Sequence, residues 1–256
     1  MLKILRKGLL FYVLILVGIG HWLTTQRTTD WDRTLWVAVH PINGDGSKQS
    51  ADYISSLERT DFKVIGEFFA AEAAEYGVSL KEPFHLTLGE IIRDQPPPPP
   101  RGGSILQVGW WSLKLRYWAW QVDRGPDPPP NDIDIFVRYF DPETTPNVEH
   151  SFGLQKGLIG VVNAFSSRRQ AGSNKVIITH ELLHTLGATD KYHPRTGEPI
   201  HPRGYAEPDV DPIFPQTLAE LMGGRIPISP TESTIPDSLA EVTVGPVTAT
   251  EIRWLQ

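Results

Sequence analysis

The chain has 256 residues and a mass of 28.7 kDa, enough for one domain with a substantial hydrophobic core. Hydrophobic residues make up 40% and charged residues 21%, which excludes wholesale disorder, and the absence of cysteine excludes disulfide scaffolds, thiol catalysis and zinc held by thiolates. The net charge is −6, and because three cations lie in the first seven positions, residues 8–256 carry −9, which argues against a nucleic-acid partner.

The first 26 residues predict a membrane segment. Basic residues at the start precede 19 residues without a formal charge, a pattern typical of an uncleaved signal anchor or a cleaved signal peptide. We favour an anchor over residues 1–26, because Trp22 suits a membrane interface and residues 24–29 suit a short tether, whereas Gly18-Ile19-Gly20 is a weak cleavage site. The positive-inside rule then places residues 27–256 outside the cytoplasm.

The next segments alternate between strand and helix patterns. Residues 35–39 read as a strand ended by Pro41, Ser50 to Tyr76 as a helix closed by Gly77, and 84–88 as a strand. Five prolines at 96–100 follow, which we interpret as a surface loop; a domain boundary or a polyproline ligand are the alternatives.

Residues 104–122 contain half of the eight tryptophans and predict a helix. We interpret their aromatic density as core packing and not as a sugar-stacking platform. The stripe at helical spacing consists of Leu106, Trp110, Leu113, Tyr117 and Trp120.

Strand patterns return in the middle of the chain. Asp132 to Phe140 predicts a strand, and Ser151 to Phe165 one or two more. This element order predicts an α/β (α+β) fold in which helices cover a mixed, not purely parallel, sheet.

A helix predicted over 174–187 contains the metal-binding pattern H-E-x-x-H, at His180, Glu181 and His184. Residues four apart share a helix face, so both imidazoles can reach one metal, and Glu181 can reach a water held there. With this composition the pattern arises by chance on the order of once in 70 such proteins.

The continuation of the pattern makes chance much less probable. Gly187 and Asp190 extend it to H-E-x-x-H-x-x-G-x-x-D, which lowers the chance expectation by roughly another 200-fold. Gly187 can adopt the left-handed conformation that ends a helix and turns the chain back. That turn would bring Asp190 to the same metal from another side.

These residues resemble the signature of the metzincin zinc peptidases, in which a third histidine is usual and the snapalysin-like branch has aspartate. The resemblance implies a Met-turn below the metal, for which Met222, followed by Gly223-Gly224, is the candidate. It also implies a metzincin-like twisted sheet and a C-terminal helix, which the capping box Thr248 to Glu251 would open.

The resemblance implies one Zn²⁺ per chain, held by His180, His184 and Asp190 with a fourth position open to water. Zinc lowers the pKa of such a water to roughly 7, and Glu181 would act as general base in the hydrolysis of a peptide or protein substrate. We therefore expect residues 27–256 to be a membrane-tethered, extracytoplasmic zinc endopeptidase. The alternative is a non-catalytic interaction module that binds a protein or cell-wall partner.

Several other residues compete for roles in the site. His193 and His201 are alternative third ligands, and a downstream glutamate (Glu198, Glu207 or Glu220) would be one in a different arrangement. The family often has a tyrosine two residues beyond the Met-turn methionine, where this chain has Gly224. Tyr192 or Tyr205 could supply an oxyanion donor instead, and we interpret His40, His85 and His150 as structural or solvated.

Overall fold

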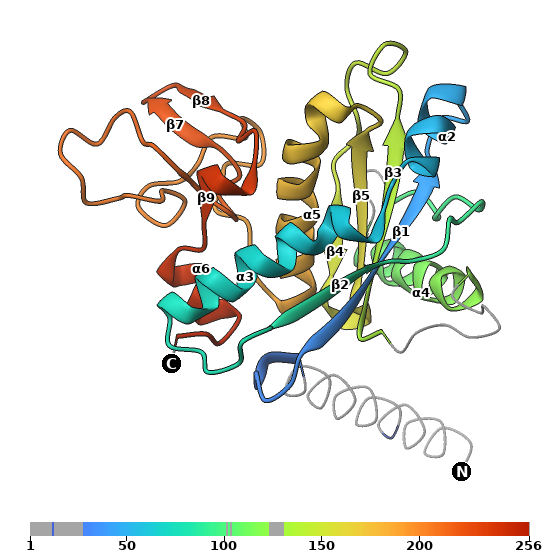
Figure 1. Cartoon of the computed structure of the whole chain (residues 1–256), viewed down its shortest axis with the longest axis horizontal. Helices are drawn as coiled ribbons and strands as arrows, with labels where there is room; N and C mark the ends of the chain where they lie inside the picture. The colour runs from blue at the N-terminus through green and yellow to red at the C-terminus, as the bar shows by residue number, and fades with distance from the viewer. Residues whose placement is uncertain (1–11, 13–27, 101, 103, 123–130, 256) are drawn as a thin grey trace.

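The computed structural model describes residues 12, 28–100, 102, 104–122 and 131–255 (Figure 1). Apart from Tyr12, the predicted anchor lies outside these residues. Among the helices of the described part, none is both long and apolar enough to cross a membrane.

A five-stranded sheet forms the centre of the molecule, in the order β2-β1-β3-β5-β4. Four strands are parallel and β4 is antiparallel to β5, which confirms the predicted mixed α/β sheet. The strands are β1 (Leu35–Asn43), β2 (Phe84–Leu88), β3 (Ile133–Phe140), β4 (Phe152–Leu154) and β5 (Ile159–Phe165).

Helices cover both faces of this sheet. One face carries α2 (Lys48–Ser55), α3 (Lys63–Glu75) and α5 (Ala171–Leu186), and the other carries α4 (Ile105–Val122). Side chains alternate along β3 accordingly, because Ile135 and Val137 join the α5 side and Phe136 joins the α4 side. Figure 1 shows the sheet between α5 and α4.

The C-terminal part packs against the same core as α5. It contains two small sheets, a final helix and one short 3-10 segment. Leu221, Met222, Val244 and Ile252 from this part are buried with the residues of α3 and α5. The elements of this part are β6 (Ala219–Glu220), β7 (Ile226–Ser229), β8 (Glu232–Thr234), β9 (Val242–Thr243), the 3-10 segment Leu239–Glu241 and α6 (Pro246–Glu251). Three further 3-10 segments lie earlier in the chain, at Arg59–Phe62, Gln155–Gly157 and Arg168–Gln170.

The prediction of one helix from Ser50 to Tyr76 is wrong, because the chain forms α2, a 3-10 turn and α3. The hydroxyls of Ser55 and Ser56 donate to backbone carbonyls three residues earlier and compete with continued helix. Glu58 then begins the next turn in a reciprocal capping arrangement with Asp61.

Two boundaries also differ from the prediction. β1 continues through Pro41, where it still pairs with β3. Its pairing with β2 ends at Val39, so on the β2 side no strand needs the N–H that proline lacks. The capping box predicted at Thr248 is wrong: Gly245 is the N-cap of α6 and Pro246 its first residue.

The predicted helix 104–122 is confirmed as α4, but the core role assigned to its stripe is wrong. All five residues of the stripe are exposed, and Trp111, Leu115 and Ala119 form the buried face instead. The proline run before α4 is a loop, and Pro97 accepts a hydrogen bond from the Trp111 indole at 2.8 Å.

Candidate metal centre

The candidate site is built on α5, which confirms the helix predicted at 174–187. Its apolar residues, such as Ile178, Leu182 and Leu186, are buried against the sheet and fix the rotation of the helix. Gly187 ends it with φ of 104°, and a Cβ there would lie 2.4 Å from the Gln155 amide nitrogen. The predicted left-handed turn is therefore present. Glycine suits it because it adopts a positive φ without strain and because it has no Cβ to collide with Gln155.

Both imidazoles are oriented by backbone carbonyls. His180 Nδ1 lies 2.9 Å from the oxygen of Leu221, and His184 Nδ1 lies 2.8 Å from that of Ala188. Because a carbonyl only accepts, each Nδ1 carries the proton and donates it. In the neutral ring this leaves the lone pair on Nε2, the arrangement that metal-binding histidines require.

Asp190 faces the Nε2 atoms of both rings. Its Oδ1 lies 3.2 Å from His180 Nε2 and 3.1 Å from His184 Nε2. Ligand atoms on a tetrahedral zinc ion about 2.0–2.1 Å away are separated by about 3.3 Å, so both distances from Asp190 Oδ1 to the imidazoles fit that ion.

The side chains of His180, His184 and Asp190 form an ion-paired cluster. Burial alone would raise the pKa of Asp190, but hydrogen bonds from His180 and His184 outweigh it and hold that pKa well below its usual range. Burial alone would lower the pKa of His180, but the bond to Asp190 and the charge of Glu181 raise it. A metal cation can replace the protons that stabilise this cluster.

Glu181 contributes a buried carboxylate beside the imidazoles. Ligand-type atoms of His180, Glu181 and His184 lie within 4.8 Å of one another. Glu181 Oε2 is buried without a hydrogen-bond partner among the described residues, and burial raises the pKa of this carboxyl. An unsatisfied buried oxygen is costly, so a missing water or ion is its natural partner.

The site opens into a cleft of about 270 Å³. His180, Glu181 and Tyr192 lie in its wall. Burial and the nearby charge of Asp190 raise the pKa of Tyr192 well above its usual range, so its hydroxyl stays protonated and can donate. The remaining lining comes mainly from Val148, Glu149, His150, Ser151, Ile177, Gly224 and Ile235.

The alternative ligands do not approach the two imidazoles. His193 is exposed, and His201 contacts the carbonyl of Pro208 and the ring of Tyr205. Glu207 binds the backbone and hydroxyl of Thr217. Within the described residues, these groups have other partners or face solvent and do not contact the two imidazoles.

The remaining three histidines of the described residues differ in burial and in their partners. His40 is buried below α4 beside Asp134, and His85 pairs with Glu82 on the surface. His150, interpreted as structural or solvated, is an exposed residue at the cleft.

Met222 is fully buried and lies in a turn next to Leu221, the residue whose carbonyl contacts His180. The amides of Gly223 and Gly224 donate to the Glu220 carbonyl at 2.9 Å, and the neighbouring Leu221 carbonyl holds His180. The turn predicted at this methionine is thus present below His180.

Glu220 is not a metal donor but holds this turn to α6. Its buried carboxylate accepts from the amides of Gly223 and Gly245 and from the Thr248 hydroxyl, at 2.7, 3.1 and 2.6 Å. The sequence offered no signal for this role, since the partners lie up to 28 residues away.

Lys191, adjacent to Asp190, was missed by sequence reasoning. Only 1% of its side chain is exposed, and its Nζ donates to the Thr189 carbonyl at 2.6 Å and to Glu251 Oε2 at 2.7 Å. Glu251 also accepts from the Thr189 amide. Because Glu251 belongs to α6, this buried ion pair attaches the turn that contains Asp190 to the C-terminal helix.

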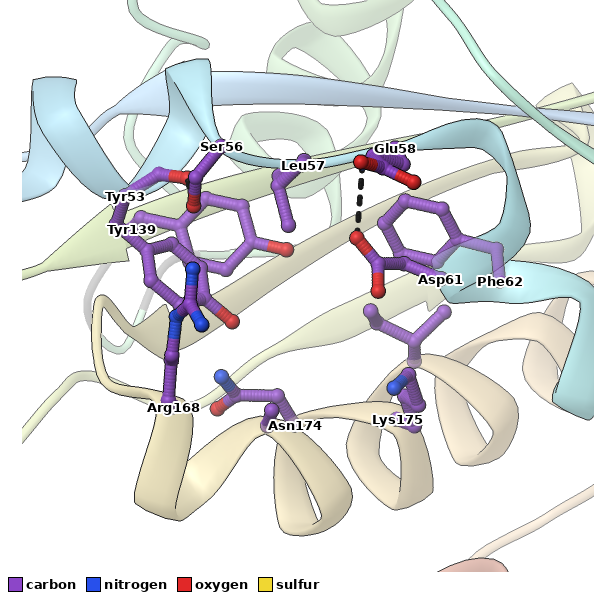
Figure 2. Close-up of a pocket in the computed structure, with 12 residues that line it drawn as sticks. Tyr53, Ser56, Leu57, Glu58, Asp61, Phe62, Tyr139, Arg168, Asn174 and Lys175 are labelled. Atoms are coloured by element: carbon purple, nitrogen blue, oxygen red, sulfur yellow. Dashed lines mark hydrogen bonds between the residues drawn. The ribbon is translucent and has the colours of Figure 1, made fainter.

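A second cavity, of about 280 Å³, lies at the other end of α5 (Figure 2). Figure 2 shows Tyr53, Tyr139 and Arg168 on one side of it and Glu58 and Asp61 on the other. The Asp61 carboxylate accepts from the Glu58 amide at 2.8 Å and is used in capping. This cavity is separate from the metal donors.

Comparison with known proteins gives only a distant structural likeness. The sequence matches no protein-family model, and no curated protein matches it. Among solved structures, wild-type OgpA of Akkermansia muciniphila aligns with a TM-score of 0.38, and catalytically inactive OgpA in complex with the O-glycopeptide substrate glycodrosocin with 0.40. In both, identity is 14%, and the alignment covers 84% of this chain and 58% of the other. This chain thus spans less than two thirds of those structures.

Proposed function

We propose that the chain is a zinc-dependent peptidase, tethered to a membrane by residues 1–26 with its catalytic domain outside the cytoplasm. The observation that carries the catalytic part is the buried Oε2 of Glu181, which has no hydrogen-bond partner in the described part of the chain and lies beside two oriented imidazoles. A non-catalytic interaction module gives no reason to keep such a carboxylate, because burying it costs free energy.

His180, His184 and Asp190 are the proposed metal ligands. Their Nε2 and Oδ1 atoms converge at distances that suit a tetrahedral ion, and the chain has no cysteine to offer instead. When bound, zinc polarises a carbonyl and lowers the pKa of a coordinated water to about 7.

Glu181 moves the proton in the proposed reaction. Its carboxylate accepts a proton from the attacking water as the oxygen–carbon bond forms, and returns it to the amine nitrogen as the carbon–nitrogen bond breaks. Burial raises the pKa of Glu181, which makes it a stronger base toward water. Tyr192 lines the cleft and its raised pKa keeps the hydroxyl protonated, which supports it over Tyr205 as the donor to the carbonyl oxygen as negative charge develops there.

The sheet edge offers a binding mode for an extended peptide. Among the described strands, β4 lies at the end of the sheet, and residues 148–151 just before it line the cleft. A peptide chain can add to such an edge through backbone hydrogen bonds. A Cβ on Gly153 would lie 2.6 Å from the Glu181 carbonyl, so close packing on α5 holds β4 beside the site.

The test is metal analysis and peptide hydrolysis by the purified full chain. Wild type should bind one zinc per chain and cleave a mixed peptide library. Glu181→Gln should keep fold and zinc but lose hydrolysis by about 10²- to 10⁴-fold, because an amide does not accept the proton. Glu198→Gln, outside the cleft, is the matched control. Zinc binding with unchanged hydrolysis in Glu181→Gln would refute this role, and absence of stoichiometric metal would refute the site.

A further inference from the structure

The outer face of α4 carries a row of exposed apolar side chains that no described element covers. We call this row the aromatic stripe. Its members are between 54% and 84% exposed: Leu106, Trp110, Leu113, Tyr117 and Trp120.

The stripe is a continuous band and not a scatter of single residues. Each residue turns a helix by about 100°, so the five side chains fall within an arc of about 80°. The rings of Tyr117 and Trp120 lie 5.7 Å apart. The opposite arc, with Trp111, Leu115 and Ala119, is buried on the sheet, so α4 cannot rotate to hide the stripe.

The area of the stripe exceeds what a soluble surface usually leaves open. Taking about 200 Å² for a large side chain, the exposed fractions give about 600 Å². Contiguous apolar patches of more than a few hundred Å² mark interaction sites.

The charges on α4 favour an anionic partner. Residues 105–122 contain no carboxylate, although the whole chain has a net charge of −6. Helical geometry puts Lys114 about 40° beyond one edge of the stripe and Arg116 about 40° beyond the other. Lys114 is exposed, whereas Arg116 is half-buried and its Nε is buried. The Lys114 ammonium lies 5.7 Å from the centre of the Trp110 ring, so cation and ring belong to one surface.

We propose that the aromatic stripe of α4 docks on an anionic lipid bilayer. Tryptophan and tyrosine favour the interface between headgroups and acyl chains, leucine favours the acyl boundary, and flanking cations bind anionic headgroups. Tryptophan, tyrosine and leucine beside an exposed lysine, with no acidic residue on the helix, are the composition of such a surface.

The start of the described fold supports this occupant. Thr28 and Thr29 are buried in the domain and cannot serve as the free tether expected from residues 24–29. This step rests on the predicted anchor: if residues 1–26 cross a bilayer, almost no chain separates it from the domain. Some face of the domain must then lie against the lipid, and α4 offers an apolar one.

Two other occupants fit less well. A stable dimer buries about 800 Å² per partner, more than the stripe offers, and α4 brings no carboxylate to pair with the cations of a second copy. A sugar platform needs polar groups beside its rings to bind hydroxyls, whereas Leu106 and Leu113 extend this surface as hydrocarbon.

Docking through α4 leaves the metal site accessible. The cleft belongs to α5, which packs on the opposite face of the sheet. A substrate would therefore reach the site from the aqueous side and not from within the bilayer.

The absence of cysteine allows a direct test by single labels on the full chain. We would attach an environment-sensitive fluorophore to Leu113→Cys and Tyr117→Cys, with Ile228→Cys on β7 as an exposed apolar control, after circular dichroism confirms folding. The chains are reconstituted in nanodiscs of phosphatidylcholine with or without phosphatidylglycerol. If the chains do not remain bound to the discs, the predicted anchor is contradicted. The stripe is then tested separately, by adding the chains to vesicles of the same lipids.

Labels on the stripe should be quenched several-fold more by doxyl lipids than the Ile228 label, at a depth of about 5–10 Å. Lys114→Glu should weaken quenching of the Leu113 label when phosphatidylglycerol is present and not when it is absent. Stripe labels as open to aqueous iodide as the Ile228 label, in discs or with vesicles, would overturn the proposal. Protection that grows with protein concentration at fixed lipid would assign the face to a second copy and would also overturn it.

Discussion

Replacing Glu251 by glutamine should destabilise the protein and weaken its metal site together. The Lys191 ammonium is almost fully buried, and Glu251 is the carboxylate that neutralises it, at 2.7 Å. Breaking a buried ion pair costs about 3–5 kcal/mol, and because a quarter of the Glu251 side chain is exposed we expect the lower range, about 2–3 kcal/mol. For a domain of this size that lowers the Tm by roughly 5–10 °C.

Denaturant unfolding and competitive zinc titration would measure the two effects. Zinc affinity should fall by about 10- to 100-fold, because Glu251 holds the Thr189 amide next to Asp190. Asp52→Asn, which breaks an exposed pair with Lys48, is the matched control and should change neither quantity measurably. Equal stability of the two variants would refute the reasoning.

The same pair predicts the sign of an acid effect. Burial raises the pKa of Glu251, but hydrogen bonds from Lys191 and Thr189 outweigh it and hold that pKa below its ordinary value of 4.5. A lowered pKa in the folded state stabilises the protein above pH 4.5, and this contribution is lost as the pH falls through the folded-state pKa. In Glu251→Gln, unfolding free energy should therefore fall less steeply below pH 4.5 than in wild type.

Two further groups of variants test how the proposed donor set is assembled. In the first group, Asp190→Ala should reduce zinc affinity by far more than 100-fold, and Asp190→His should restore it. His193→Ala and His201→Ala should bind zinc as wild type does in the same titration. A result in which His193 or His201 is essential and Asp190 is dispensable would refute the ligand set. In the second group, Glu220→Gln should lower the free energy of unfolding by about 2 kcal/mol, because an amide cannot accept from all three donors. The volume-conserving Met222→Leu should lower it by less than about 1.5 kcal/mol. Denaturant unfolding measures both, and the reverse order would show that the turn depends on the methionine and not on the carboxylate.

Local patterns predicted those parts of the molecule whose rules are local. The strands of the central sheet and α5 follow from periodicity, whereas the short strands β6 to β9 were not predicted. Gly187 follows from the left-handed turn that ends a helix. The breaks within 50–76 were missed because apolar spacing continued across them, although Ser55-Ser56 and the Glu58–Asp61 capping pair mark the interruption.

The exposure of α4 could not be read from its sequence. The helix has two apolar arcs, one with Trp111, Leu115 and Ala119 and one with the aromatic stripe, and periodicity does not tell which faces the sheet. Packing decided it: the arc that is buried interlocks with the sheet, as Trp111 does edge-on with Phe152 at 5.0 Å. The richer aromatic arc was left outside.

The candidate site shows a related limit, since the motif supplies donors but not what orients them. His180 depends on the Leu221 carbonyl 41 residues later, and Asp190 depends on a turn fixed by Lys191 and Glu251, 60 residues apart. Those partners are set by the path of the chain after Gly187, which returns below α5 and ends in α6. Because that path stays on the α5 side of the sheet, the proposed metal donors and the residues that orient them lie on one face of the sheet, and α4 lies on the other. The two faces can therefore be altered separately: damage to the stripe should leave zinc binding intact, and loss of the donors should leave lipid contact intact.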